Sequence, residues 1–297
     1  MKSFLATVSL TGLITSFLVV AGAATPTPQL PPLNEPASGL QLPGKFIWFD
    51  LATPAIQEQQ NFYGNVFGWS FESPMRTEDQ YLLIVNGGHA IGGMFSYEPP
   101  DGEQDGAAWI GLMSVPDTER AAQTVKANGG SVEINPMQVA GRGRHALFRD
   151  PAGAIFGVLR SDSGDPPDVE VEIGDVLWVD LYARDLEQMV AFYQQLAPYE
   201  VNPREIADAI PGKTLSIDGV LRGGIVAVDE EANRTAWVPY IRVEEVAATL
   251  EKVVAGGGFA IVPPDERLLD GNLAVFVDPN GGVTGIIKWE YAGEPLQ

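Results

Sequence analysis

A segment near the start of this chain occurs a second time further along, and this duplication constrains the fold more than any other feature. Phe46 to Trp69 reads FIWFDLATPAIQEQQNFYGNVFGW, and Leu177 to Tyr199 reads LWVDLYARDLEQMVAFYQQLAPY. Two later landmarks repeat at the same spacing, Trp109 with Trp237 and the DPAG at Asp150 with the DPNG at Asp278. Each pair, like Trp48 and Trp178, stands 128 to 130 positions apart. Landmarks in one order and at one period indicate two copies of a domain.

The first 43 residues precede the duplicated part. Residues 1–23 combine Lys2, an apolar stretch and the small residues Ala21-Gly22-Ala23, which is the pattern of a cleaved secretory signal peptide. We therefore expect an exported protein, periplasmic or extracellular, with an uncleaved membrane anchor as the alternative. Residues 24–43 are rich in proline and have no hydrophobic period, so they predict an extended linker.

The overall charge and the absence of cysteine exclude several classes of function. The formal net charge is −21, so we expect no binding to nucleic acid and no membrane contact beyond the export signal. The chain has no cysteine, which excludes disulfides, thiol nucleophiles and thiolate metal sites.

Within each half, the hydrophobic pattern predicts two βαβββ units. In the first unit, residues 46–51 alternate as a strand, Thr53-Pro54 opens a helix that ends at Gly68, and three short strands follow. The same pattern restarts at Trp109, Leu177 and Trp237. We therefore predict an α+β fold of four βαβββ modules, in two tandem domains at residues 44–160 and 175–291, with an acidic linker at 161–174 and a C-terminal tail at 292–297.

This arrangement resembles the vicinal oxygen chelate (VOC) superfamily, which includes glyoxalase I, bleomycin-resistance proteins and extradiol dioxygenases. The residues that carry the resemblance are FYGNVFGW at Phe62, the DP-x-G turns at Asp150 and Asp278, and the Gly-Gly pairs beginning at Gly92 and Gly223. The resemblance covers residues 44–291 and implies two tandem glyoxalase-like domains. In such domains the paired units curl into a cup, and enzymes of the family hold a divalent metal ion there.

The resemblance also implies where metal ligands would stand, and those positions hold other residue types. They are Trp48 and Trp178 on the first strand, Ile110 and Val238 in the second unit, and Gly157 and Gly285 on the last strand. None of these side chains can ligate a metal ion, so we predict no metal cofactor. A divalent metal remains an alternative, with His145 as a weak candidate ligand or with an oxygen-only site at Asp50 or Asp180.

The cups are the candidate ligand sites. Strand side chains alternate, so an aspartate two residues after each first-strand tryptophan shares its face. An indole beside a carboxylate suits a neutral or cationic small molecule through stacking, cation–π contact and charge, whereas the alternative is a cup filled by the indole itself. The candidate ligand-binding residues are Trp48, Asp50, Trp109, Trp178, Asp180, Tyr182 and Trp237.

We predict an exported glyoxalase-like protein that binds a small molecule or acts without a metal ion, and we identify no catalytic residue. One alternative is a metal-dependent lyase, isomerase or dioxygenase with displaced ligands. Another is sequestration of a cationic compound, as in bleomycin-resistance proteins, and a third is a structural role with a sealed cup. One scaffold supports many reactions, so the resemblance names no substrate.

Overall fold

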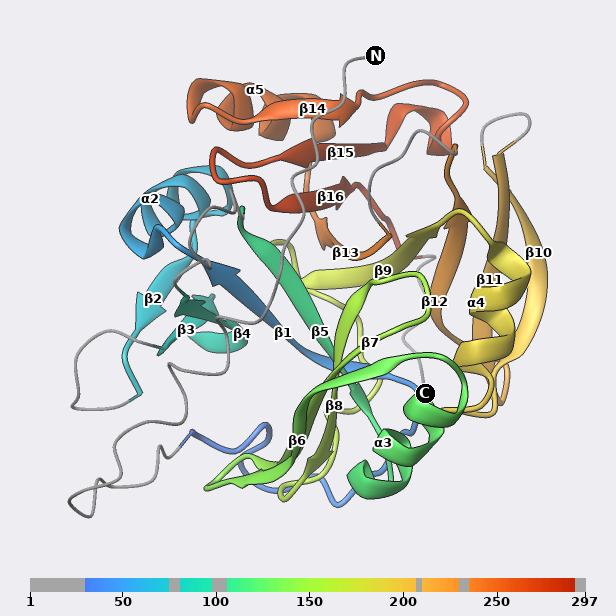
Figure 1. The fold of residues 1–297 in the computed structure, drawn as a ribbon. Helices are drawn as coiled ribbons and strands as arrows, with labels where there is room; N and C mark the ends of the chain where they lie inside the picture. The colour runs from blue at the N-terminus through green and yellow to red at the C-terminus, as the bar shows by residue number, and fades with distance from the viewer. Residues whose placement is uncertain (1–29, 75–80, 98–105, 207–209, 230–234, 292–297) are drawn as a thin grey trace.

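Each half of the chain forms a mixed eight-stranded sheet, and the two sheets have the same strand order (Figure 1). The computed structural model describes residues 30–74, 81–97, 106–206, 210–229 and 235–291. The first sheet has the order β2-β3-β4-β1-β5-β8-β7-β6, and the second has the order β10-β11-β12-β9-β13-β16-β15-β14. The prediction of an α+β fold built from βαβββ units is confirmed.

The elements fall within the two halves that the repeat defines. The first half contains β1 (Phe46–Thr53), α2 (Ile56–Phe67), β2 (Ser70–Glu72), β3 (Tyr81–Asn86), β4 (His89–Ser96), β5 (Ala108–Ser114), α3 (Thr118–Ala127), β6 (Ser131–Val139), β7 (Gly143–Arg149) and β8 (Ile155–Ser161). The second half contains β9 (Val176–Ala183), α4 (Leu186–Tyr193), β10 (Glu200–Ile206), β11 (Ile210–Ile217), β12 (Val220–Ala227), β13 (Ala236–Arg242), α5 (Val246–Ala255), β14 (Phe259–Val262), a short 3-10 helix η2 (Leu269–Gly271), β15 (Leu273–Val277) and β16 (Val283–Ile287).

Local chemistry explains where several elements begin and end. The Asp117 carboxylate accepts hydrogen bonds from the backbone N–H groups of Glu119 and Arg120, which satisfies the free donors at the start of α3. Helix α2 ends at Gly68, whose φ of 78° is left-handed and favours glycine.

Each sheet has two faces with different surroundings. On β1, Phe49 and Leu51 belong to a core that both halves share, whereas Trp48 and Ala52 belong to a separate apolar cluster on the opposite face. We call this opposite face of the first sheet the first cup. The corresponding face of the second sheet, around Tyr240, is the second cup.

The duplicated motifs join the two halves. Tyr63 of α2 donates a hydrogen bond to Oδ2 of Asp278 at 2.9 Å, and Tyr193 of α4 donates to Oδ2 of Asp150 at 3.0 Å. Both carboxylates are buried, and burial raises the pKa of Asp150 to about 6 against the hydrogen bonds that stabilise its charge. The tyrosine helix and the DP-x-G turn therefore serve the pairing of the halves.

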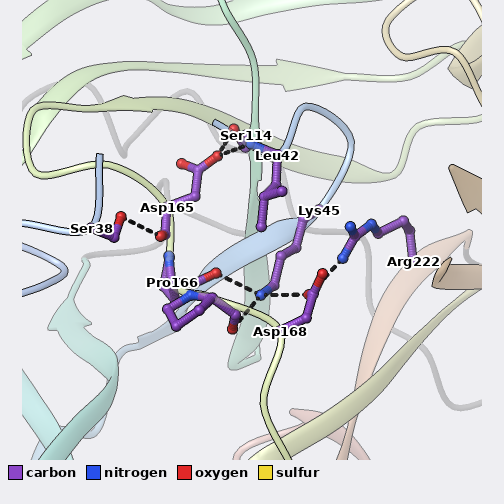
Figure 2. A network of polar contacts seen from close by, with 9 residues as sticks. Ser38, Leu42, Lys45, Ser114, Asp165, Pro166, Asp168 and Arg222 are labelled. Carbon is purple, nitrogen blue, oxygen red and sulfur yellow. Dashed lines mark hydrogen bonds and ion pairs between the residues drawn. The ribbon is translucent and has the colours of Figure 1, made fainter. Parts of the chain in front are cut away.

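The proline-rich segment is not a free spacer. Residues 30–43, called the strap below, lie along the first half, where Ser38 N–H donates to the Ser163 carbonyl at 2.9 Å. The Asp165 carboxylate, which is 2% exposed, accepts from Leu42 N–H at 2.5 Å and from the Ser114 hydroxyl at 2.6 Å (Figure 2). These residues form no helix or strand and are docked on the first half, because polar groups of the 161–174 segment satisfy part of the strap's backbone. Residues 1–29 and 292–297 lie outside the described residues.

A charged cluster ties the 161–174 segment to both halves. Asp168 binds Lys45 at 2.9 Å and Arg222 at 2.7 Å, and Lys45 also donates to the Pro166 carbonyl at 2.7 Å (Figure 2). Burial lowers the pKa of Lys45, and the hydrogen bonds from Arg222 and Lys45 lower the pKa of Asp168 against the opposing effect of burial.

Among the described residues, no helix has both the length and the apolar character to span a membrane.

Candidate ligand site

The first cup contains a compact polar group on apolar walls. Trp48 Nε1 donates to Oδ1 of Asp50 at 2.9 Å, and the Tyr81 hydroxyl donates to the same oxygen at 2.8 Å. Burial raises the pKa of Asp50, and the hydrogen bonds from Tyr81 and Trp48 oppose that rise. Asp50 therefore lies on the same face as Trp48, as strand alternation predicts, and it is hydrogen-bonded to the side chains of Trp48 and Tyr81.

The glycine pair on β4 makes room for this group. A Cβ atom at Gly92 would lie 2.6 Å from the Phe49 carbonyl oxygen, and one at Gly93 would overlap both the Asp50 carboxylate and the Tyr81 hydroxyl. The first glycine thus permits close packing of β4 on β1, and the second admits the polar group.

Arg142 is the most unusual residue of the first cup. Its side chain is 1% exposed, and its Cζ atom lies 4.0 Å from the centre of the Trp48 ring. None of its three guanidinium nitrogens has a hydrogen-bond partner among the residues that the structure describes. Burial lowers the pKa of Arg142, while Tyr81 and Asp50 raise it, and arginine stays charged in proteins. A buried charge without a hydrogen-bond acceptor is unfavourable, so this guanidinium can bind an acceptor that the described part of the chain does not supply.

His145 lies on the same face of β7 as the cup residue Leu147, because its neighbour Ala146 points into the shared core. Its Nε2 atom is buried and has no hydrogen-bond partner within the described ranges of the chain. Burial, and secondarily the charge of Arg142, lower the pKa of His145 to about 3. His145 is therefore neutral at physiological pH and adds a second unsatisfied polar group to the first cup.

The second cup repeats the tryptophan–aspartate pair but satisfies it differently. Trp178 Nε1 donates to Oδ1 of Asp180 at 2.8 Å, and Arg204 donates to the same oxygen at 2.7 Å. Asp180 is 1% exposed, so burial raises its pKa, and the charge of Arg204 opposes that rise. The register places Gly212 where the first half has Tyr81, so the arginine of β10 takes over the role of the missing phenol.

Tyr182 also lies in the second cup, as predicted from strand alternation. Its hydroxyl shares a hydrogen bond with that of Tyr240, and burial raises the pKa of both phenols. Tyr240 comes from β13 and was not foreseen in the sequence.

The positions that would hold a metal ion do not fit one. Trp48 and Trp178 face the cups with their indole nitrogens already hydrogen-bonded to aspartate. A side chain at Gly157 would overlap Leu112, and a Cβ atom at Gly285 would lie 2.5 Å from Cγ of Tyr240 with still closer ring contacts. Within the described ranges, no three His, Asp or Glu side chains converge as metal ligands, and His145 has no acidic partner.

Trp109 and Trp237, which were among the predicted ligand-binding residues, are not in the cups. Both belong to the shared core, where Trp109 Nε1 donates to Thr284 Oγ1 at 3.0 Å and Trp237 Nε1 donates to the Tyr193 hydroxyl at 2.7 Å. Strand alternation explains the error, since Ile110 and Val238 are the residues of those strands that face the cups.

Comparisons with known proteins agree with this architecture. Residues 45–158 match the model of the Glyoxalase/Bleomycin resistance protein/Dioxygenase superfamily. The match places one domain of that superfamily at residues 45–158. Over 243 residues it is 25% identical to the putative glyoxylase CFP32 of Mycobacterium tuberculosis, covering 81% of this chain and 93% of the relative. It is 28% identical over 264 residues to the anthracycline biosynthesis protein DnrV of Streptomyces peucetius, covering 83% and 94%.

Solved structures share the superfamily fold. The Mn(II)-bound glyoxalase of Novosphingobium aromaticivorans aligns with a TM-score of 0.57 at 17% identity, covering 87% of this chain and 85% of the other. The 2,3-dioxygenase LapB of Pseudomonas sp. KL28 aligns with a TM-score of 0.53 at 14% identity, covering 88% and 97%. The first of these holds manganese, whereas the ligand positions implied for this chain are occupied by indoles and glycines.

Proposed function

We propose that this protein binds a small organic molecule in the first cup and does so without a metal ion. The observation that carries the proposal is the buried Arg142 guanidinium, which lies over the indole of the apolar first-cup cluster and has no hydrogen-bond acceptor among the described residues. Small-molecule sites typically combine apolar and aromatic walls with a few unsatisfied polar groups. The similarity to a putative glyoxylase and to an anthracycline biosynthesis protein supports a role with small organic compounds.

Metal-dependent chemistry of the glyoxalase or dioxygenase type would require ligands displaced from their usual places. Asp50 and Asp180 are the carboxylates nearest to such a place, and both already accept hydrogen bonds from an indole and from a second side chain. Their environments therefore support the metal-independent proposal.

The contacts of these two aspartates also bear on the charge that the ligand carries. A sequestered cation would need a free carboxylate, but Asp180 is neutralised by Arg204 and the nearest cation to the first-cup tryptophan is Arg142 itself. These contacts favour a ligand that is not cationic over the capture of a cationic compound.

The test combines metal analysis with calorimetric titration of the purified protein. The probes are 2-naphthamide and 2-naphthoate, which share a planar apolar body, and the variants are Trp48→Phe and the matched Trp178→Phe. We expect substoichiometric metal content, binding of at least one probe, and weaker binding in Trp48→Phe but not in Trp178→Phe. Binding that depends on added Mn²⁺, or the absence of binding to either probe, would contradict the proposal.

We further propose that the protein is exported, on the pattern of residues 1–23. Amino-terminal sequencing of the protein recovered outside the cytoplasm should begin directly after the Ala21-Gly22-Ala23 site. A chain that begins at Met1 and sediments with membranes would instead support the anchor.

A further inference from the structure

We propose that the ligand of the first cup carries a carboxylate, that Arg142 binds this group, and that the strap covers it. This inference rests on the proposed function and names the class of ligand. It assigns an organic acid with an apolar body to a site that the family resemblance associates with a metal ion.

The unpaired donors of Arg142 determine which ligand groups it can bind. Its Cζ atom lies 4.0 Å from the centre of the Trp48 ring, and none of its guanidinium N–H donors has a hydrogen-bond partner among the described residues. A planar fork of donors matches the two oxygens of a carboxylate in a bidentate pair. Oδ1 of the neighbouring Asp50 already accepts hydrogen bonds from Trp48 and Tyr81, and no described residue accepts one from Arg142, so a bound ligand can supply the acceptor.

His145 supplies a second polar group for the same ligand. Its Nε2 atom is buried without a partner, and it shares the first cup with Arg142. In the tautomer that carries its proton on Nε2, a neutral imidazole donates one hydrogen bond, which suits an oxyanion already held by the guanidinium. The cluster that contains Trp48 on this face is apolar and includes Leu83, Leu112, Leu147 and Leu159, so an organic anion fits better than an inorganic one.

The second cup differs from the first because its arginine has a carboxylate acceptor within the chain. There the guanidinium of Arg204 binds the Asp180 carboxylate directly at 2.7 Å, so the charge is satisfied inside the chain. Two copies of one scaffold thus differ in whether their arginine has an internal acceptor. The proposal therefore applies to the first cup alone.

The strap lies against this site. Leu30 is 8% exposed and packs into the apolar cluster of the first cup together with Leu33. Its backbone N–H donates to the Ala140 carbonyl at 3.0 Å, two residues before Arg142. In Figure 1 the blue amino-terminal segment runs beside the ends of β6 and β8. A ligand therefore reaches Arg142 when this part of the strap moves.

The experiment measures affinities by calorimetry for 2-naphthoate, its uncharged analogue 2-naphthamide, and sulfate. The variants are Arg142→Met and the matched control Arg204→Met, each first shown to be folded by its thermal transition. We expect 2-naphthoate to bind the natural protein at least about 30-fold more tightly than 2-naphthamide, as for a buried charge-assisted pair. Arg142→Met should remove this preference, and Arg204→Met should retain it.

The other outcomes separate this inference from the proposed function. Equal binding of 2-naphthamide and 2-naphthoate, unchanged in Arg142→Met, would overturn the carboxylate assignment and leave the first cup as a ligand site. Sulfate that binds as tightly as 2-naphthoate would replace the organic acid with an inorganic anion and overturn the assignment too. No binding of any probe would overturn both proposals. Should Arg142→Met fail to fold, Arg142→Lys keeps the charge without the planar fork and should weaken 2-naphthoate binding about tenfold.

Discussion

Replacing Arg142 with methionine should stabilise the ligand-free protein, which is the opposite of what most core substitutions do. Methionine approximates the length of the arginine stem and fills irregular apolar space. The substitution removes a guanidinium that is 1% exposed and has no acceptor. The loss of a buried unpaired charge is favourable, because that charge gives up hydration without a compensating hydrogen bond.

The magnitude follows from three contributions. The effective cost of one buried ion is several kcal/mol, taken here as about 4 kcal/mol. The contact with the Trp48 ring at 4.0 Å is a cation–π interaction that stabilises the folded state by about 2 kcal/mol when desolvated. The charge of Asp50 also attracts Arg142, and the loss of this attraction reduces the gain. We therefore expect Arg142→Met to increase the free energy of unfolding by up to about 2 kcal/mol. At about 2 °C for each kcal/mol in a chain of this size, Tm should rise by up to roughly 4 °C.

The assay is reversible urea unfolding of exhaustively dialysed protein at pH 7, with Arg204→Met as the matched control. Arg204 pairs with Asp180, which is 1% exposed, so removing it leaves a buried carboxylate with one donor fewer. The control should lose about 1.5–3 kcal/mol. A loss of more than about 1 kcal/mol in Arg142→Met would refute the reasoning, because it would mean that Arg142 has a stabilising partner in the ligand-free protein.

Three other predictions follow from buried groups elsewhere. Asp165→Ala should release the strap, because the Asp165 carboxylate accepts a hydrogen bond from Leu42 N–H. The rate of limited proteolysis within residues 30–43 should then rise by about tenfold or more. Unchanged cleavage would mean that other contacts hold the strap. Asp150 has a folded pKa of about 6 against 3.8 unfolded, so its stabilisation is complete below about pH 3.8 and is lost as pH rises through about 6. Its contribution to the free energy of unfolding should be about 1 kcal/mol larger at pH 5 than at pH 7, and Asp150→Asn should flatten the measured pH dependence by that amount; an equal pH dependence in both proteins would contradict the assignment. Gly285→Ala should destabilise the protein by about 1–3 kcal/mol in urea unfolding, since the added methyl meets the buried Tyr240 ring; a neutral effect would show that the ring can move.

Much of the fold could be predicted because its signals are local and repeated. The alternation from Phe46 to Leu51, the glycine after α2 and the acidic cap of α3 each act within a few residues, and the repeat shows them twice. The pairing of Trp48 with Asp50 was predictable for the same reason, since strand alternation alone brings them to one face. Docking of the strap was not predictable, because its polar partners on the first half and the 161–174 segment lie at least 110 positions away.

The residues that distinguish the two cups come from distant strands, and this is why sequence reasoning missed them. Arg142 precedes β7 and meets Trp48 from β1, while Arg204 reaches Asp180 from β10. No spacing rule relates these positions, because sheet register and the lateral order of strands bring them together. Trp109 was misplaced for a related reason, since the face of a strand depends on its neighbours in the sheet.

The amino-acid sequence by itself determined the architecture, because backbone propensities, caps and strand alternation are set by neighbouring residues and a duplication confirms them. It also determined that indoles and glycines stand where related proteins would hold a metal ion. Only the tertiary structure decided which charges are satisfied, because a guanidinium finds or lacks an acceptor through contacts between segments remote in the chain. For that reason two nearly identical tryptophan–aspartate pairs differ, one closed by Arg204 and the other left with the unsatisfied Arg142.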